Sequence, residues 1–173
     1  MARTQTFTTM ISIPDPLHPA LVHFPIVLIL ACTAVAVVAV FLRRWHLPWL
    51  AAGLLLTGAA GAAAAAWSGE EDEESTGKLS ARAEQVLEEH EEWGDRARNL
   101  AIVAGLLAAG AVVAGRSPKV ARGIGIAAAV AGLAASYAVA EAGHYGGLLV
   151  YQHGVGVSAP GAPAPAAKSR DRD

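Results

Sequence analysis

Histidine is the residue type that offers this chain the most chemistry, and its six histidines lie near the ends of apolar runs. A neutral imidazole can bind haem iron, copper, zinc or nickel, or it can form hydrogen bonds. The stretch "HPALVHFP" places two of them directly before a long apolar run, and the full set is His18, His23, His46, His90, His144 and His153. Because hydrocarbon is a poor environment for imidazole, we expect these side chains to have hydrogen-bond partners or a ligand.

Other reactive groups are scarce. The single cysteine, Cys32, lies inside an apolar run and is interpreted as a small buried hydrophobic residue. The sequence contains no CxxCH motif, which excludes a c-type haem, and "HGVGV" lacks the lysine of a phosphate-binding loop. No Ser/His/Asp order and no paired carboxylates suggest a reaction. The sequence therefore favours a protein that is not an enzyme acting alone, although a redox role stays open.

The elements that must position the histidines are membrane spans. Of the 173 residues 54% are hydrophobic and only 6% aromatic, and the mean hydropathy is +0.40. Runs of about 20 apolar residues can cross a bilayer as helices. The runs that meet or approach this length cover residues 21–42, 47–67, 97–115 and 123–142. We therefore predict an all-α, four-span transmembrane helix bundle whose alanines and glycines allow close packing.

The charges predict the orientation of this bundle. Its two short connections carry only positive charge, namely Arg43 and Arg44 in the first and Arg116, Lys119 and Arg122 in the second. The positive-inside rule places both in the cytoplasm, with the two chain ends outside the cytoplasmic membrane. Arg96 and Arg98 at the outer end of the third span, and the basic residues of the C-terminal tail, disagree with the rule.

The chain ends have no apolar pattern to pack. We expect a flexible N-terminus over residues 1–13, a membrane domain over 14–158 and a disordered tail over 159–173.

An acidic segment separates the second and third spans. Eleven of the fifteen acidic residues lie between Glu70 and Asp95. Residues 70–74 are expected to form a solvated loop, and Ser75 or Thr76 to cap the helix that follows. In the segment that follows, six apolar residues and one histidine are separated alternately by four and three positions, so they share one helical face: Leu79, Ala83, Val86, His90, Trp93, Ala97 and Leu100. The third span is thus predicted to extend outward as an acidic amphipathic helix, on which a membrane or periplasmic redox partner could dock; no basic footprint for nucleic acid is present.

The two remaining segments carry helix-breaking residues. Asp15 and Pro16 suit the start of a helix, and Pro25 predicts a kink that frees the carbonyl of Leu21. After the fourth span, three glycines predict a break and a short segment that folds back over the outer end of the bundle: Gly143, Gly146 and Gly147. A turn is expected at Gly154 and Gly156.

Span parity places most of the histidines at one end. With antiparallel neighbouring spans, His18, His23, His90 and His153 all belong to the outer side, and His46 belongs to the opposite side. His90 is expected about 9 Å beyond the hydrocarbon edge, because six helical residues separate it from Arg96. His18 and His23 are about 140° apart around a regular helix, so they need a kink or separate partners to share a site.

Three motifs resemble a known family. "HPALVHFPIVL", "LEEHEE" and "GGLLVYQHGVGV" are similar to motifs of the bacterial membrane family called domain of unknown function 2231, over roughly residues 14–158. The resemblance implies a four-span integral protein of the bacterial cytoplasmic membrane. The recurrent histidines of the family correspond to His18, His23, His90 and His153, whereas His144 belongs to none of these motifs. The family is also similar in helix count and histidine placement to membrane b-type cytochromes, which suggests haem b, and it implies no catalytic residue.

Two functional hypotheses follow. In the first, two or more of His18, His23, His90 and His153 bind a haem b, or alternatively a metal ion, for membrane electron transfer, and Glu89 or Glu141 orients an imidazole. In the second, the protein is a non-enzymatic structural or accessory membrane protein without a cofactor, whose histidines form a hydrogen-bonded cap. Transport or proton relay is less favoured, because the inner parts of the spans carry no charge.

Overall fold

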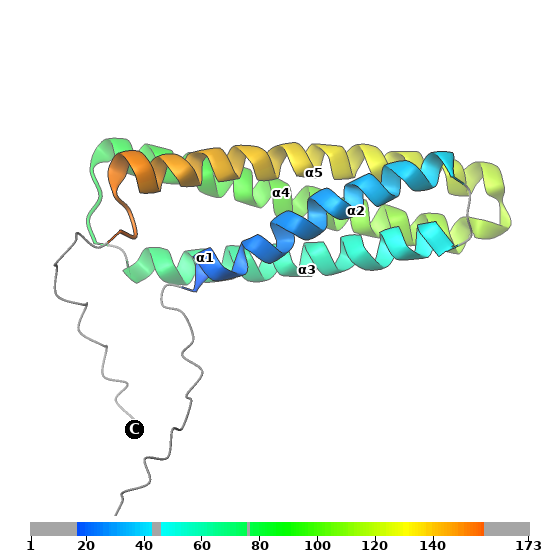
Figure 1. Ribbon diagram of the computed structural model, residues 1–173, viewed down its shortest axis with the longest axis horizontal. Helices are drawn as coiled ribbons and strands as arrows, with labels where there is room; N and C mark the ends of the chain where they lie inside the picture. Colours follow the sequence, from blue (N-terminus) through cyan, green and yellow to red (C-terminus); the bar gives the residue numbers. More distant parts are fainter. Residues whose placement is uncertain (1–16, 43–45, 76, 158–173) are drawn as a thin grey trace, which may run out of the picture.

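The computed structural model describes residues 17–42, 46–75 and 77–157. Its elements are α1 (His18–Leu21), α2 (His23–Phe41), α3 (His46–Ser75), α4 (Ala81–Val113), the short 3₁₀ helix η1 (Ala114–Arg116) and α5 (Pro118–His153). They form an elongated helical bundle in which α1 and α2 together make the first span (Figure 1). The predicted all-α, four-span architecture is confirmed: within the described residues, four helical stretches are long and apolar enough to cross a membrane. The predicted flexible ends, Asp15, Pro16, Arg43 and Arg44 lie outside the described residues.

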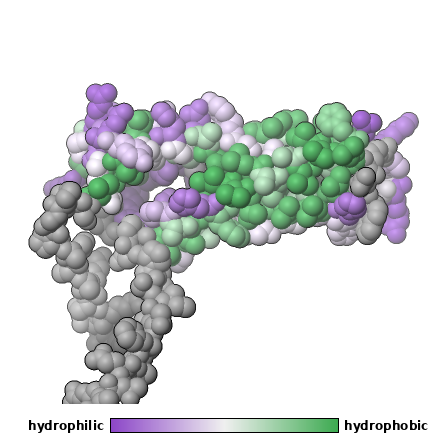
Figure 2. Space-filling view, in the orientation of Figure 1, coloured by the Kyte–Doolittle hydropathy of each residue, from purple (hydrophilic) through white to green (hydrophobic). Residues whose placement is uncertain are grey.

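Small side chains allow the helices to approach one another closely. Most residues of the buried core are alanines. A Cβ atom on Gly132 would lie 2.8 Å from Oγ1 of Thr33, and the hydroxyl of Ser136 donates to the same Oγ1 over 3.2 Å. Since lipid gives helices no hydrophobic reason to associate, such close packing and interhelical hydrogen bonds must hold the bundle together. Figure 2 shows the complementary outer surface, which is apolar over the middle of the bundle and hydrophilic toward its two ends.

The first span is interrupted where the sequence predicts a kink. Val22 separates α1 from α2, and the helical hydrogen bonds resume with the amide of Ile26, which donates to the carbonyl of Val22 over 3.2 Å. Pro25 has no N–H to offer the carbonyl of Leu21, so one hydrogen bond is missing at this level. Val22 itself keeps helical φ and ψ angles of −62° and −27°, so α1 and α2 form one span.

The acidic stretch predicted as a loop is helical. α3 continues through Glu70, Glu71, Asp72 and Glu73 to Ser75. Glutamate is a good helix former, and Asp72 gains a partner by accepting a hydrogen bond from the backbone amide of His18 over 2.9 Å. The cap of α4 is Ser80, whose hydroxyl accepts from the amide of Ala83, and so neither Ser75 nor Thr76, which lies outside the described residues, has this role.

The predicted fold-back segment instead continues the fourth span. α5 runs without a break through Gly143, Gly146 and Gly147 to His153. Each helical glycine costs about 1 kcal/mol relative to alanine, but packing against α4 outweighs this local preference. The predicted turn is confirmed at Gly154 and Gly156, whose φ angles are 67° and 75°. There the amide of Gly154 donates to the carbonyl of Val150 over 3.1 Å, as in an αL cap of a helix C-terminus.

Candidate histidine site

His18 is held at the start of α1 by three groups of α3. Its Nδ1 lies 2.8 Å from the carbonyl oxygen of Ala65 and 3.3 Å from Oγ of Ser68. Ser68 is buried and donates its own hydroxyl proton to the same carbonyl over 2.9 Å. The backbone amide of His18 donates to the carboxylate of Asp72, which also places a negative charge at the N-terminus of α1. The motif "HPALVHFP" is therefore anchored on α3.

His90 is held in the same way between α4 and α5. It lies on the predicted seam of α4, where Ala83 and Ala97 are buried, and its Nδ1 is 2.8 Å from the carbonyl oxygen of Ala142. His90 precedes the apolar segment 97–115, so it stands in the polar outer part of α4. Burial lowers the pKa of His90; the hydrogen bond to Ala142 opposes this shift, and the nearby charge of His18 adds to it. Burial therefore favours the neutral form of His90.

The hydrogen bonds fix which ring nitrogen of each histidine carries the proton. A carbonyl oxygen can only accept, so Nδ1 must donate in both His18 and His90. In a neutral imidazole this leaves Nε2 with a lone pair. Metal-binding histidines are commonly oriented by an Nδ1 hydrogen bond to a main-chain carbonyl. Here the carbonyls of Ala65 and Ala142 orient the two imidazoles. Neither Glu89 nor Glu141, which the sequence suggests for this purpose, accepts these hydrogen bonds.

The two imidazoles meet between the two halves of the bundle. Their ring centroids are 6.1 Å apart and their planes are nearly perpendicular, at 89°. Toward this end, α1 and α3 run apart from α4 and α5 (Figure 1). The ring contact joins α1 of the first pair to α4 of the second. A Cβ atom on Gly69 would lie 3.1 Å from Nδ1 of His18, and one on Gly146 would lie 3.1 Å from Cε1 of His90. Both rings therefore rest on positions where any larger residue would crowd them.

The contacts of the two histidines repeat in the two halves of the chain. His18 donates to Ala65 and rests against Gly69 four residues later, in "AAWSG". His90 donates to Ala142 and rests against Gly146 four residues later, in "AGHYG". Each half thus supplies one histidine that precedes the apolar part of a span and an Ala-x-x-x-Gly platform on its partner helix. Sequence reasoning missed these platforms, although the two matching spacings were a readable signal.

The other histidines lie apart from this pair. His23 is exposed, and its Nδ1 bonds to the carbonyl of Pro19 in its own span over 2.7 Å. His144 is exposed and its ring is 5.3 Å from that of Tyr145, while half-buried His153 ends α5. His46 begins α3 at the opposite end of the bundle. Of the four predicted site residues, the structure brings His18 and His90 into direct ring contact and does not bring His23 or His153 into it.

The sequence matches a family described as "Predicted membrane protein (DUF2231)" over residues 14–159. The chain belongs to this family. The match confirms the resemblance carried by the histidine motifs and spans the whole histidine site. No curated protein and no solved structure matches the chain.

Two arginines in the outer part of α4 form ion pairs within the helix. Arg96 pairs with Glu92 and covers the ring of Trp93 at 4.5 Å, and Arg98 pairs with Asp95. Each of the two arginines is thus paired with an acidic residue of the same helix.

One carboxyl group of this outer part has an altered pKa. Partial burial, a hydrogen bond to Glu73 and neighbouring negative charges raise the pKa of Glu91 to about 7. α3 and α4 are thus linked by a carboxyl pair that takes up a proton near neutral pH.

Proposed function

We propose that His18 and His90 are the two protein ligands of a haem b at the outer end of the bundle, and that the protein transfers electrons in the bacterial cytoplasmic membrane. The observation that carries this proposal is the matched pair of imidazoles, each held by an Nδ1 hydrogen bond that leaves Nε2 with a lone pair. Imidazole is a common protein ligand of haem iron.

The separation of the rings supports a ligand between them. Two imidazoles bound on opposite sides of one metal ion have centroids about 6.2 Å apart, because each metal–nitrogen bond is about 2.0 Å and Nε2 lies about 1.1 Å from the ring centre. The observed separation is 6.1 Å. The distance between the two ring centroids thus matches that of two imidazoles bound to one ion.

Haem is favoured over a bare metal ion by the number of protein ligands. A bound zinc ion commonly has three or four protein ligands. Among the described residues, no group of three or more His, Cys, Asp or Glu side chains is placed to hold a metal ion. A haem needs only two ligands from the protein, since the porphyrin supplies the other four. A metal ion bound by His18 and His90 is thus the alternative occupant of this site, with His23 or His153 as further ligands.

Position and charge suggest how the site would serve electron transfer. When bound, a haem supplies one-electron redox chemistry. By the positive-inside rule the histidine end lies outside the cytoplasm. There the exposed acidic face of α4, with Glu84, Glu88 and Glu92, fits a membrane or periplasmic redox partner that has a basic docking surface.

Optical spectroscopy of the detergent-purified protein tests the proposal. We expect a Soret band, and sharp α and β bands after reduction with dithionite. Elemental analysis of the same sample should give about one iron per chain. A colourless protein that stays colourless after incubation with hemin and contains no stoichiometric metal would refute both occupants.

Asparagine variants separate ligation from structure. The side-chain amide of asparagine reaches about as far as Nδ1, so His90→Asn keeps a donor for Ala142 but has no group in place of Nε2. We expect His18→Asn and His90→Asn to lose haem while retaining the melting temperature of the apoprotein. His144→Asn is the matched control and should keep its haem.

The second candidate function is structural, with the histidines as a hydrogen-bonded cap of the bundle. The hydrogen bonds of His18 and His90 support it, because they join α1 to α3 and α4 to α5. In a non-enzymatic accessory protein the histidines would only close the outer end of the bundle. The wild type would then bind no cofactor, and the alanine variants of His18 and His90 would melt at lower temperature than their asparagine counterparts.

A further inference from the structure

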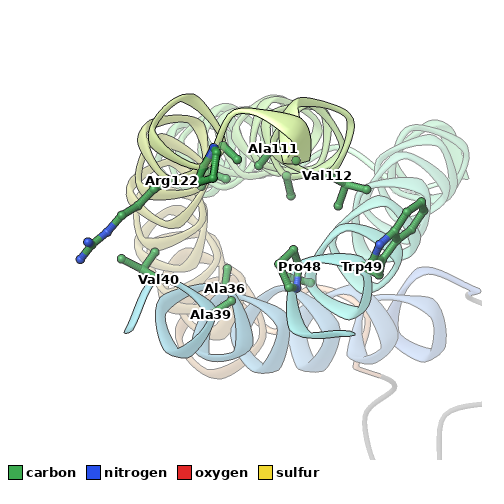
Figure 3. A pocket seen from close by; sticks show the side chains of 15 residues that line it. Ala36, Ala39, Val40, Pro48, Trp49, Ala111, Val112 and Arg122 are labelled. Carbon is green, nitrogen blue, oxygen red and sulfur yellow. The ribbon is translucent and has the colours of Figure 1, made fainter. Parts of the chain in front are cut away.

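A second candidate site lies at the opposite, basic end of the bundle. A cavity of about 330 Å³ opens there between all four spans. Its walls include Ala36 of α2, Trp49 of α3, Ala111 of α4 and Ala128 of α5. Figure 3 shows side chains of several helices surrounding this space. The cavity shares no residue with the histidine site, so a ligand of the cavity is independent of the haem proposed there.

The cavity combines an apolar wall with a cationic edge. Among the described residues that line the cavity, Arg122 is the one that carries a charge, and its side chain extends away from the cavity in Figure 3. Exposed Arg116 and Lys119 precede Arg122 in the same basic connection. No acidic residue occurs in segment 96–140 of the sequence, so nothing near in the chain neutralises these three cations.

We infer that this cavity binds an anionic glycerophospholipid, with an acyl chain against the alanine-rich wall and the phosphate at Arg122. Because small apolar side chains line the cavity, an acyl chain can enter between the helices. The guanidinium group of Arg122 can bind two phosphate oxygens as a bidentate donor. Basic pockets between spans on the cytoplasmic side are suited to anionic headgroups. A neutral, zwitterionic lipid would gain the same apolar contacts but would leave the three positive charges uncompensated.

Native mass spectrometry of the full-length protein can measure this binding. The protein is released from mixed micelles that contain equal amounts of phosphatidylglycerol and phosphatidylcholine, and the retained lipids are counted. We expect one phosphatidylglycerol retained in preference to phosphatidylcholine. Arg122→Gln should weaken phosphatidylglycerol binding about fivefold, as expected for the loss of one cation near an anionic lipid. Arg82→Gln, which removes an exposed cation at the other end, should leave it unchanged.

A space-filling variant tests the place of the acyl chain. Ala39 lines the cavity, so Ala39→Leu should reduce lipid retention, whereas Ala31→Leu on the exposed face of α2 should not. Melting curves of both variants confirm that each is folded. Equal retention of the two lipids, or unchanged retention in Arg122→Gln, would overturn the headgroup site. Unchanged retention in a folded Ala39→Leu protein would overturn the cavity as the place of the chain.

Discussion

Replacing Gly146 by alanine tests whether the glycine platform is required for the position of His90. Gly146 and Gly143 are both helical residues in the outer part of α5. A Cβ atom on Gly143 would meet nothing within 4 Å, whereas one on Gly146 would lie 3.1 Å from Cε1 and 3.2 Å from Nδ1 of His90. The two substitutions make the same chemical change in the same helix, so their difference isolates the contact with the imidazole.

The expected magnitudes follow from helix propensity and the hydrogen bond. Gly143→Ala should stabilise the protein by about 1 kcal/mol, because alanine is the better helix former. Gly146→Ala gains the same amount but pushes the ring by a few tenths of an ångström and weakens its bond to Ala142. The loss of such a bond costs about 0.5–1.5 kcal/mol, and local crowding adds to it. We therefore expect Gly146→Ala to be neutral or destabilising, about 1–2 kcal/mol below Gly143→Ala.

Thermal unfolding in detergent measures this difference. For a chain of this size, 1 kcal/mol corresponds to about 2–4 °C, so Gly143→Ala should melt a few degrees above wild type and Gly146→Ala at or below it. The haem content of Gly146→Ala should also fall while that of Gly143→Ala is kept. Equal increases in melting temperature for the two variants would refute the reasoning, since the imidazole would then not be confined by Gly146.

Three further predictions concern other contacts. The pKa of Glu91 is raised from its ordinary value of 4.5 to about 7, so the extra stability that its proton provides is present below pH 4.5 and is lost as the pH rises through 7. Glu91→Gln should therefore raise the melting temperature at pH 8 but hardly at pH 4, and a similar gain in Glu89→Gln would contradict this assignment. Gly132→Ala should lower stability by about 1–2 kcal/mol in thermal unfolding, because its Cβ would lie 2.8 Å from Oγ1 of Thr33; a stabilised variant would show that the helices can separate without cost. Ser80→Ala should cost about 1 kcal/mol by removing the cap of α4, and Ser80→Asp should restore the wild-type melting temperature.

The sequence could not predict several local structures, because tertiary contacts outweighed local preference. From the sequence, the acidic stretch after the second span is expected to form a loop and the glycines after the fourth span to break the helix, yet α3 and α5 continue through them. In α3, Asp72 gains a partner in the amide of His18. In α5, Gly146 is the small residue against which His90 rests. Asp72 and Gly146 each belong to a stretch for which the sequence predicts a loop or a break. Each contacts another helix instead, and the local sequence pattern contains no information about that contact.

By itself, the sequence determined the four spans, the seam of α4 and the presence of histidines at one end of the bundle. Apolar run length, helical periodicity and span parity are properties of the chain alone, and they suffice for these features. Only the tertiary structure decided that His18 and His90 form a pair while His23 turns back to Pro19 in its own span. The physical reason is register: the axial shift and rotation of two packed helices select which carbonyl faces an imidazole and which position must lack a side chain. The chain encodes that register through contacts spread over whole helices, here through Ala65, Ala142 and the glycines that follow them.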